Sequence, residues 1–367
     1  MRPFFSGYKT FDWILLCAPL FLTCLGFAAQ YSIDLSLQHT FSNSYLRTQL
    51  IACMIGLFVC ISLYLTHART LYSTATLLYS TSLLLLISVL FFGVEIRGTQ
   101  GWFRIAGNSF QPAELAKISL ILILSWLITR YGRNFMQFRF IAASALFTAF
   151  PVLLIMLQPD LGSALVLCCI WFGMLVTLQV PYRYTLGTIL ISICTAIVGW
   201  FFLFAPYQKE RILTFVDPSR DPLGAGYNVS QSIIAIGSGG FFGRGLGFGS
   251  QSQLRFLPEA QTDFVFAVIA EELGFIGSAC ILLLFALFLW RLITHIKAAK
   301  SEFGAYVLTG IAFVFFIQFV FNIGGATGLL PITGVTLPFV SYGGSSLLIS
   351  YTLLGIALCI SRGQYTD

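Results

Sequence analysis

Long apolar runs separated by short polar stretches dominate the chain, and ten of these runs are long enough to form a helix that crosses a bilayer. A helix needs about 20 apolar residues to span a hydrocarbon core roughly 30 Å thick. The pattern predicts spans near residues 12–33, 46–66, 71–93, 112–129, 138–157, 161–180, 184–205, 263–290, 303–324 and 343–361. The predicted fold class is therefore all-α, a polytopic integral membrane protein of about ten transmembrane helices.

Residues 206–262, between the seventh and eighth spans, interrupt the series of short connections. A loop of this length in a compact bundle is usually functional. It carries nine glycines between Gly224 and Gly249, whose backbone can approach a ligand closely and whose amides can bind phosphate oxygens. The alternative interpretation is a mobile, glycine-rich surface loop. We expect residues 1–367 to form one transmembrane domain that includes residues 206–262 as a large extracytoplasmic loop.

Composition agrees with this interpretation, because 57% hydrophobic residues, 9% charged residues and a mean hydropathy of +0.88 exceed what a soluble domain of 367 residues can bury. The nine cysteines lie in or at the ends of predicted spans, which favours small core residues over a disulfide framework. The three histidines show no metal-ligand spacing. Gly26-Phe27-Ala28 resembles a signal-peptide cleavage site, but we interpret the first span as retained.

The distribution of basic residues predicts the orientation, since short cytoplasmic loops are enriched in lysine and arginine. The short outer loops would carry only Arg47, Arg97 and Arg104. The cytoplasmic segments would carry Arg2, Lys9, Arg69, Arg130, Arg133, Arg139, Arg183, Arg291, Lys297, Lys300 and Arg362. Both termini are therefore predicted to be cytoplasmic, as an even number of spans also requires. The net charge of +6 then reflects topology, and no nucleic-acid partner is expected.

Asp263 is the first candidate catalytic residue. A charged side chain near hydrocarbon is costly and is retained mainly for function. Asp263 lies at the predicted start of the eighth span, where it could instead cap the helix and favour its dipole. Phe264 and Phe266 would supply apolar walls that raise the pKa of the carboxyl group toward the range of a general base.

Other ionisable residues of the predicted spans have structural and functional interpretations side by side. Glu271 and Glu272 would face different sides of the eighth span, either lining a wet cavity or bonding neighbouring helices. Glu114 and Lys117 share one helix face and can form an ion pair, in which Lys117 could also attract an anionic substrate. Asp160 is expected to form a turn or cap the sixth span, with a supporting role at a site as the alternative.

Five motifs together resemble the SEDS family of cell-wall glycosyltransferases and occur in order across nearly the whole chain. They are Gly98–Arg104, Gln111–Lys117, Gln158–Gly162, Leu257–Ala267 and Ser341–Ser346. Residues 221–240 resemble the RodA branch more closely than the division-associated FtsW branch. The chain departs from the family pattern at Gln261, Ile233, Arg255, Gly325 and Thr336. Because Ile233 replaces a frequent lysine, we hypothesise that Arg255 restores a positive charge nearby.

The resemblance implies a lipid II polymerase in the cytoplasmic membrane of a bacterium, active on its outer face during cell elongation. Asp263 matches the family's catalytic aspartate and would deprotonate the acceptor 4-hydroxyl group. The undecaprenyl diphosphate that leaves requires positive charge or a divalent cation. Mg²⁺ or Mn²⁺ is one candidate for that charge and basic side chains are the alternative; no DxD motif fixes a metal position, and no organic cofactor is expected. The candidate substrate-binding residues are Lys117, Glu114, Arg104, Arg211, Arg244, Asp160, Glu259, Ser341, Tyr342 and Ser345.

The resemblance also implies partners besides lipid II and membrane lipids. A class B penicillin-binding protein would cross-link the strands, and its membrane segment would dock on the eighth and ninth spans. Four aromatic residues of the ninth span could form that surface or face lipid, namely Phe313, Phe315, Phe316 and Phe319.

Two other functions remain open. A transporter of lipid-linked saccharide would use Glu114, Lys117, Glu271 and Glu272 as pathway groups, although no inverted repeat of interrupted helices is evident. A noncatalytic scaffold of the wall-synthesis complex would leave Asp263 dispensable for chemistry.

Overall fold

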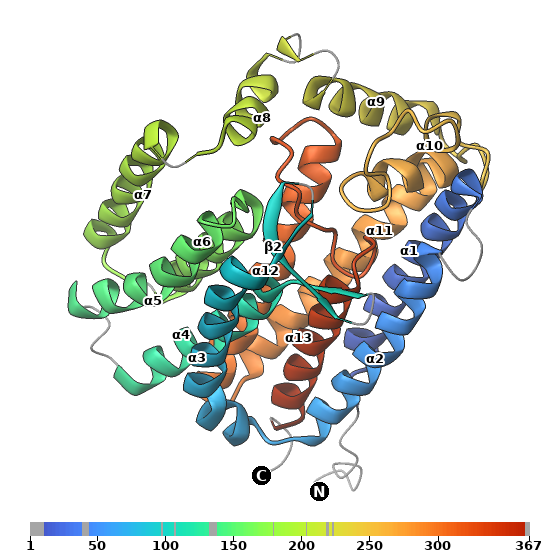
Figure 1. Ribbon diagram of the computed structural model, residues 1–367. Helices are drawn as coiled ribbons and strands as arrows, with labels where there is room; N and C mark the ends of the chain where they lie inside the picture. Colours follow the sequence, from blue (N-terminus) through green and yellow to red (C-terminus); the bar gives the residue numbers. More distant parts are fainter. Residues whose placement is uncertain are drawn as a thin grey trace, which may run out of the picture.

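The computed structural model describes residues 11–38, 44–96, 98–105, 108–131, 138–178, 180–202, 204–217, 220–221 and 224–363. The described chain is a bundle of long helices with a very small sheet, which confirms the predicted fold class (Figure 1). Nine helices in this part of the chain are long and apolar enough to cross a membrane, and α6 is a shorter apolar helix of 17 residues. The ten helices are α1 (Trp13–Leu37), α2 (Tyr45–Leu65), α3 (Ala68–Phe92), α4 (Pro112–Tyr131), α5 (Phe138–Met156), α6 (Leu161–Thr177), α7 (Tyr182–Phe202), α11 (Val265–Ala298), α12 (Glu302–Ala326) and α13 (Gly344–Gly363).

Helices α4 and α13 occupy the interior of the bundle and are buried on nearly all sides. Close helix contacts depend on small residues, as is usual in membrane bundles. A Cβ on Gly56 of α2 would lie 3.0 Å from the Tyr351 side chain of α13, and one on Gly355 would lie 2.8 Å from the Cys60 backbone. Helix α7 is the opposite case, since it stands at the edge of the bundle with most of its side chains exposed (Figure 1).

The first and last described residues lie at the same end of the bundle, hereafter the termini end. The ring of Phe11 packs against Tyr64, and the guanidinium group of Arg362 lies 5.3 Å from the same ring. Arg2, Lys9, Arg97 and Arg133, which entered the orientation argument, lie outside the described residues. A cytoplasmic termini end therefore stays a prediction.

Asp12 joins α1 to α11 at the termini end. Its carboxylate accepts the amide of Leu15 at 3.0 Å as the α1 N-cap, and the same side chain lies 2.5 Å from Arg291 Nε and from His295 Nε2. Burial raises the pKa of Asp12, but the hydrogen bonds with His295, the Leu15 amide and Arg291 outweigh it and hold that pKa below its usual value. The contact is a charged clamp between the two helices.

A small antiparallel sheet stands between α3 and α4, where only a short loop was anticipated. Its strands are β1 (Val94–Ile96), β2 (Thr99–Ile105) and β3 (Asn108–Phe110), in the order β1-β2-β3. Gly98 makes the tight β1–β2 turn at a φ of +76°, a conformation that glycine adopts without steric cost. The sheet lies at the end of the bundle opposite the termini, hereafter the loop-rich end, because Ser345 at the start of α13 donates to Ser109 O of β3 whereas Arg362 at the other end of α13 lies at Tyr64.

Residues 206–262 form helices and turns at the loop-rich end. The helices are α8 (Pro206–Val216), α9 (Ala225–Ser238) and α10 (Ser250–Gln253). Beneath them α11 is broken at Gly274, whose φ of 66° and ψ of −157° are not helical. The break frees two carbonyls, and the loop bonds them: Arg244 donates its amide to Glu271 O at 3.0 Å, and Gly245 donates to Glu272 O at 2.9 Å. The glycine-rich segment thus completes a broken helix.

Candidate functional site

A cavity of about 400 Å³ opens at the loop-rich end between the sheet, α4, α6, α8 and the start of α13. Its wall includes the turn before α11 and the irregular segment 331–336 after α12. Seven residues singled out from the sequence line it: Glu114, Lys117, Asp160, Arg211, Asp263, Tyr342 and Ser345. The fold thus collects groups that are up to 231 positions apart in the sequence (345 − 114) into one chamber.

Asp263 enters the cavity from a tight turn that precedes α11. The amides of Thr262, Asp263 and Phe264 all point at the carbonyl of Glu259, at 3.1, 3.1 and 3.4 Å. Phe264 is the N-cap residue of α11 and makes no side-chain cap bond, so Asp263 lies one residue outside the capping position. The capping interpretation is therefore not supported, and the half-buried carboxylate is presented to the cavity.

The backbone around Asp263 is held by side chains from other helices. Asn322 of α12 donates its amide group to the carbonyls of Asp263 at 3.3 Å and Val335 at 2.9 Å. Ser341 donates its hydroxyl group to Thr262 O at 2.6 Å. Asn322 is buried and was not anticipated, although an amide side chain in an apolar span is itself a signal of an interhelical bond. The turn is fixed in place by these contacts.

Arg211 of α8 and Asp263 approach each other beside Gly334. A Cβ built on Gly334 would lie 3.6 Å from Arg211 Nη1 and 3.9 Å from Asp263 Oδ2. Gly334 has a φ of +75°, which a side chain would strain. The guanidinium carbon of Arg211 lies 5.6 Å from the centre of the Tyr207 ring on the same helix, which orients it. One cation and one carboxylate therefore flank a glycine with no side chain between them.

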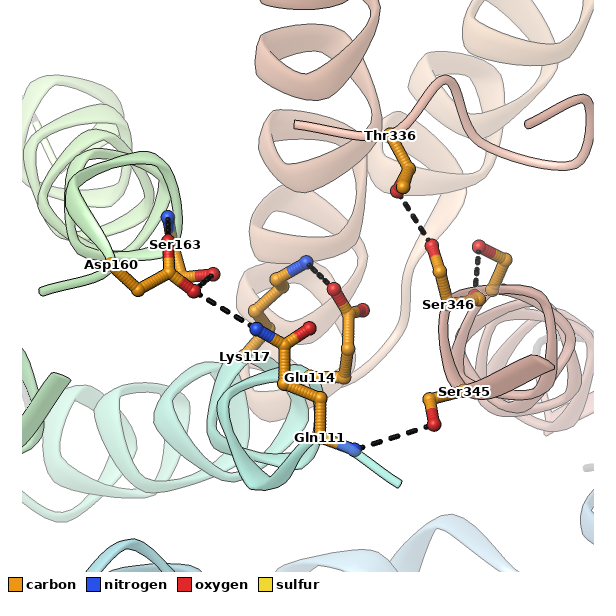
Figure 2. Close-up of polar contacts among 9 residues, drawn as sticks. Gln111, Glu114, Lys117, Asp160, Ser163, Thr336, Ser345 and Ser346 are labelled. Carbon is orange, nitrogen blue, oxygen red and sulfur yellow. Dashed lines mark hydrogen bonds and ion pairs between the residues drawn. The ribbon is translucent and has the colours of Figure 1, made fainter. Parts of the chain in front are cut away.

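Glu114 and Lys117 form the expected ion pair on α4, with 2.6 Å between Lys117 Nζ and Glu114 Oε1. Both side chains are buried, and Figure 2 shows the pair facing the space between α4, α6 and α13. A buried ion pair is costly to desolvate and is weak evidence for stability alone. Its place in the cavity wall favours a role toward a charged ligand.

Asp160 is the N-cap residue of α6, which confirms the expectation that it caps the sixth span. It accepts the Ser163 amide at 3.0 Å and the Ser163 hydroxyl group at 2.7 Å. It also accepts the side-chain amide of Gln111 at 2.9 Å, which ties the start of α6 to the start of α4 (Figure 2). The backbone amide of Gln111 in turn donates to the hydroxyl oxygen of Ser345 in α13 at 3.3 Å. The cavity floor is a connected polar network.

Four predicted residues do not line the cavity. Arg104 is exposed on β2. Arg244 donates to Ser238 O and Ser250 Oγ, both at 3.2 Å, so its guanidinium group braces the glycine-rich segment. Glu259 and Ser341 lie behind the wall and shape the Asp263 turn, as described above. The hypothesis of Arg255 as a compensating charge also lacks support, because its guanidinium group donates to Ser36 O of α1 at 2.8 Å and is absent from the lining.

Glu271 and Glu272 are fully buried and bind the glycine-rich segment. Glu271 accepts the amides of Gln251 at 2.7 Å and Ser252 at 3.0 Å. Glu272 accepts the hydroxyl group of Ser32 and the amide of Gly247, the latter at 3.2 Å. Within the glycine-rich segment the amides of Arg244, Gly245 and Gly247 are thus engaged by these two glutamates, which gives no support to a phosphate site there. Neither glutamate lines the cavity that holds Glu114 and Lys117.

The four aromatic residues considered as a partner surface on α12 point mostly inward. Phe315 is fully buried and stacks on Phe339, and Phe319 stacks on Phe285. The ring of Phe313 packs directly on Gly173 of α6, where an added Cβ would lie within 2.6 Å of the ring. Of the four, Phe316 is exposed. The sequence could not predict these directions, because α12 is apolar on all sides and its pattern does not distinguish the face in the bundle from the face in lipid.

The described lining carries two cations and three carboxylates, a formal balance of 2 − 3 = −1. Within the described residues no group of three or more His, Cys, Asp or Glu side chains could hold a metal ion. The protein therefore offers, in this part of the chain, no complete ligand cage of its own. What the arrangement provides is a carboxylate, two cations and a polar floor in a chamber bordered by transmembrane helices.

Comparison with known proteins places these features in context. Residues 12–366 match the FtsW/RodA/SpoVE model, described as cell cycle protein. Stage V sporulation protein E of Bacillus subtilis (strain 168) is 37% identical over 361 residues, which cover 96% of this chain and 97% of that protein. Peptidoglycan glycosyltransferase MrdB of Escherichia coli (strain K12) is 38% identical over 307 residues, which cover 83% of this chain and 82% of that protein.

Solved structures agree in fold over almost the full length. A chain of a peptidoglycan synthase complex, studied for the coordination of polymerization and crosslinking, matches with a TM-score of 0.82 and 35% identity, covering 98% of this chain and 100% of that one. The rod shape determining protein RodA of Thermus thermophilus matches with a TM-score of 0.73 and 34% identity, covering 98% of this chain and 99% of that one.

Proposed function

The chain belongs to the FtsW/RodA/SpoVE family of cell cycle proteins, the SEDS family, and from that premise we propose that it is a peptidoglycan glycosyltransferase that polymerises lipid II. The observation that carries the proposal is the cavity in which Asp263, Arg211 and Lys117 meet at one end of the bundle. The relatives named as peptidoglycan glycosyltransferases supply the reaction class. Elongation of the cell, the role of the RodA branch, is the proposed setting.

Asp263 is the proposed general base. Its carboxylate takes the proton from the 4-hydroxyl group of the acceptor GlcNAc as that oxygen attacks the anomeric carbon of the donor. The bond from the anomeric carbon to the diphosphate oxygen breaks, and the α-linkage is inverted to a β-1,4 bond. Undecaprenyl diphosphate leaves with the electron pair. The turn fixed by Asn322 and Ser341 supports this role, because a base must be held within hydrogen-bond reach of its proton.

Lys117 and Arg211 are the proposed binding groups for the diphosphate, since they are the cations in the described cavity wall. Glu114 positions Lys117 through the ion pair, the Tyr207 ring orients Arg211, and Asp160 holds Gln111 at the start of α4. Because the lining has a formal balance of −1, a doubly charged diphosphate gains from an accompanying divalent cation. Because the described residues hold no metal-ligand group, Mg²⁺ or Mn²⁺ would arrive with the diphosphate of the substrate and would neutralise charge on the leaving phosphate oxygens.

The proposed location is the cytoplasmic membrane of a bacterium, with both termini in the cytoplasm and the cavity on the outer side. The concentration of basic residues near the termini end supports this orientation. A class B penicillin-binding protein is the proposed partner, since polymerised strands must be cross-linked. The likeness to a chain of a peptidoglycan synthase complex supports such an assembly.

The deciding experiment is polymerisation of lipid II by purified protein in liposomes with a divalent cation, with and without the coexpressed penicillin-binding protein. Wild type should form glycan ladders, and Asp263→Asn should form none while keeping its thermal stability. Asp217→Asn is the matched control, because Asp217 is exposed in the same outer segment and outside the cavity wall. Ladders from Asp263→Asn would refute the base assignment. No ladders under any condition, with lipid II crossing sealed vesicles, would favour the transporter.

A further inference from the structure

Residues 241–248, hereafter the aromatic loop, expose large apolar side chains at the loop-rich end. Phe242 is 79% exposed, Phe248 76% and Phe241 59%. Leu246 between them is exposed as well. Contiguous apolar surface of this kind outside the transmembrane spans marks an interaction site. The cavity does not account for it, because none of these side chains lines the cavity wall.

The aromatic loop is held in a defined position on α11. Phe275 and Ile276, just after the helix break, donate their amides to Gly240 O at 2.9 Å and Phe241 O at 3.3 Å. The rings of Phe241 and Phe275 stack with centroids 5.6 Å apart. With the Arg244 and Gly245 amides also bonded to α11, the rings project from a braced backbone. Their exposure is therefore a built feature of the fold.

The length of α11 sets the level of the aromatic loop relative to a bilayer. The helix has 34 residues, or about 51 Å at about 1.5 Å per residue, which exceeds a hydrocarbon core of roughly 30 Å. The part beyond the break, residues 275–298, has 24 residues and is about 36 Å long, enough to cross by itself. Gly274 thus lies near one boundary of the hydrocarbon. Phe275 is 61% exposed, and exposed apolar residues such as Leu283 follow it along α11 toward the termini end.

We propose that the aromatic loop inserts as a shallow wedge into the outer leaflet, so that lipid covers its exposed apolar side chains. Phe241, Phe242 and Phe248 would lie at the boundary of acyl chains and headgroups, where aromatic side chains are enriched. The exposed guanidinium group of Arg244 would lie at the level of the lipid phosphates. Figure 1 shows the segment between α9 and α10 at the outer end of α1 and α11, on the side of the molecule away from α8.

The wedge sets the height of the site above the membrane. Asp263 precedes Gly274 by 11 residues (274 − 263), or about 16 Å along the chain direction of α11. Anchoring the break at the hydrocarbon boundary therefore fixes the Asp263 turn relative to the outer surface of the membrane, from which a sugar on a membrane-bound diphosphate would enter the cavity. The insertion itself does not depend on the proposed activity.

Tryptophan scanning in nanodiscs tests the insertion. Phe242→Trp and Phe248→Trp are compared with wild type, whose six tryptophans give the background emission, and with Leu283→Trp as the control within the span. Lipids brominated near the glycerol ester or near the chain end quench at different depths. We expect bromines near the glycerol ester to quench the emission that the added tryptophan gives in both loop variants. Bromines near the chain end should instead quench the added emission of Leu283→Trp.

Three results decide the matter. Quenching by shallow bromines that persists in the complex with the penicillin-binding protein supports the wedge. Added emission that is untouched by brominated lipid and lost to aqueous iodide places the aromatic loop in water and overturns it. Lipid quenching that disappears when the complex forms identifies a protein interface and overturns it as well. All three readings are independent of polymerisation, so a failure here leaves the proposed function intact.

Discussion

Replacing Gly334 with alanine adds one methyl group between the two charged side chains that flank the cavity. The new Cβ lies 3.6 Å from Arg211 Nη1 and 3.9 Å from Asp263 Oδ2, which are ordinary van der Waals distances. The free protein therefore accommodates the methyl group sterically. What it cannot avoid is the backbone conformation, because an alanine at a φ of +75° costs about 1–2 kcal/mol of folding free energy.

Gly240→Ala separates that backbone cost from an effect on the site. Gly240 has a φ of +54°, nothing lies within 4 Å of its Cβ position, and it is not part of the cavity wall. Both variants should therefore lose about 1–2 kcal/mol of stability. Only Gly334→Ala places atoms where a substrate would contact Asp263 and Arg211. A displacement of reacting groups by about 1 Å costs on the order of 100-fold in rate.

The assay is the initial rate of glycan ladder formation from lipid II, with thermal unfolding of each variant measured in the same detergent. We expect similar melting temperatures for the two variants, near-wild-type polymerisation by Gly240→Ala and a loss on the order of 100-fold for Gly334→Ala. If Gly334→Ala polymerises as fast as Gly240→Ala, the reacting groups do not meet beside Gly334. The placement of the site between Asp263 and Arg211 would then be wrong.

Three further perturbations probe the supports of the site and the bundle. Asn322→Leu leaves the carbonyls of Asp263 and Val335 without their donor, at about 1–3 kcal/mol each, and should abolish ladders; full activity would show that the turn holds itself. Glu271→Leu removes the acceptor of two loop amides and should speed hydrogen exchange in residues 249–253, whereas unchanged protection would rule out that clamp. The pKa of Asp12 is lowered in the folded protein, so its stabilisation is present above the unfolded value of 3.8 and disappears as pH falls through the folded value. Asp12→Asn should therefore flatten the acid limb of thermal stability below about pH 4, and an unchanged limb would contradict the clamp.

Features with a local signal could be predicted from the sequence. Ten apolar runs correspond to ten helices because each span must satisfy its own backbone in lipid, which leaves a strong pattern. Asp160 before a new apolar run indicated a cap, and Glu114 and Lys117 at i, i+3 indicated an ion pair. Both depend on residues within one helical turn.

Features that depend on distant partners left no such signal. Arg211 reaches the neighbourhood of Asp263 across 52 residues (263 − 211), by way of a helix inside a presumed loop. Gly274 lies inside the apolar run of the predicted eighth span, and the helix break there is matched by bonds from its neighbours to residues 240–245. The strands β1 and β3 have three residues each, too short for any periodicity. The phosphate interpretation of the glycine-rich segment gains no support for the same reason, because the amides of Arg244, Gly245 and Gly247 bind Glu271 and Glu272.

The packing of α13 against α2 bears on how the protein matures during synthesis. Their contact is the most extensive between described elements, and it joins α2 to a helix that is synthesised about 280 residues later (344 − 65). Until α13 is inserted, the groove on α2 around Gly56 and Cys60 has no occupant from this chain. Ser345, at the start of α13, also closes the polar floor only then. A ribosome-bound nascent chain should therefore carry no assembled cavity, and premature termination should produce an inert fragment instead of an unregulated enzyme.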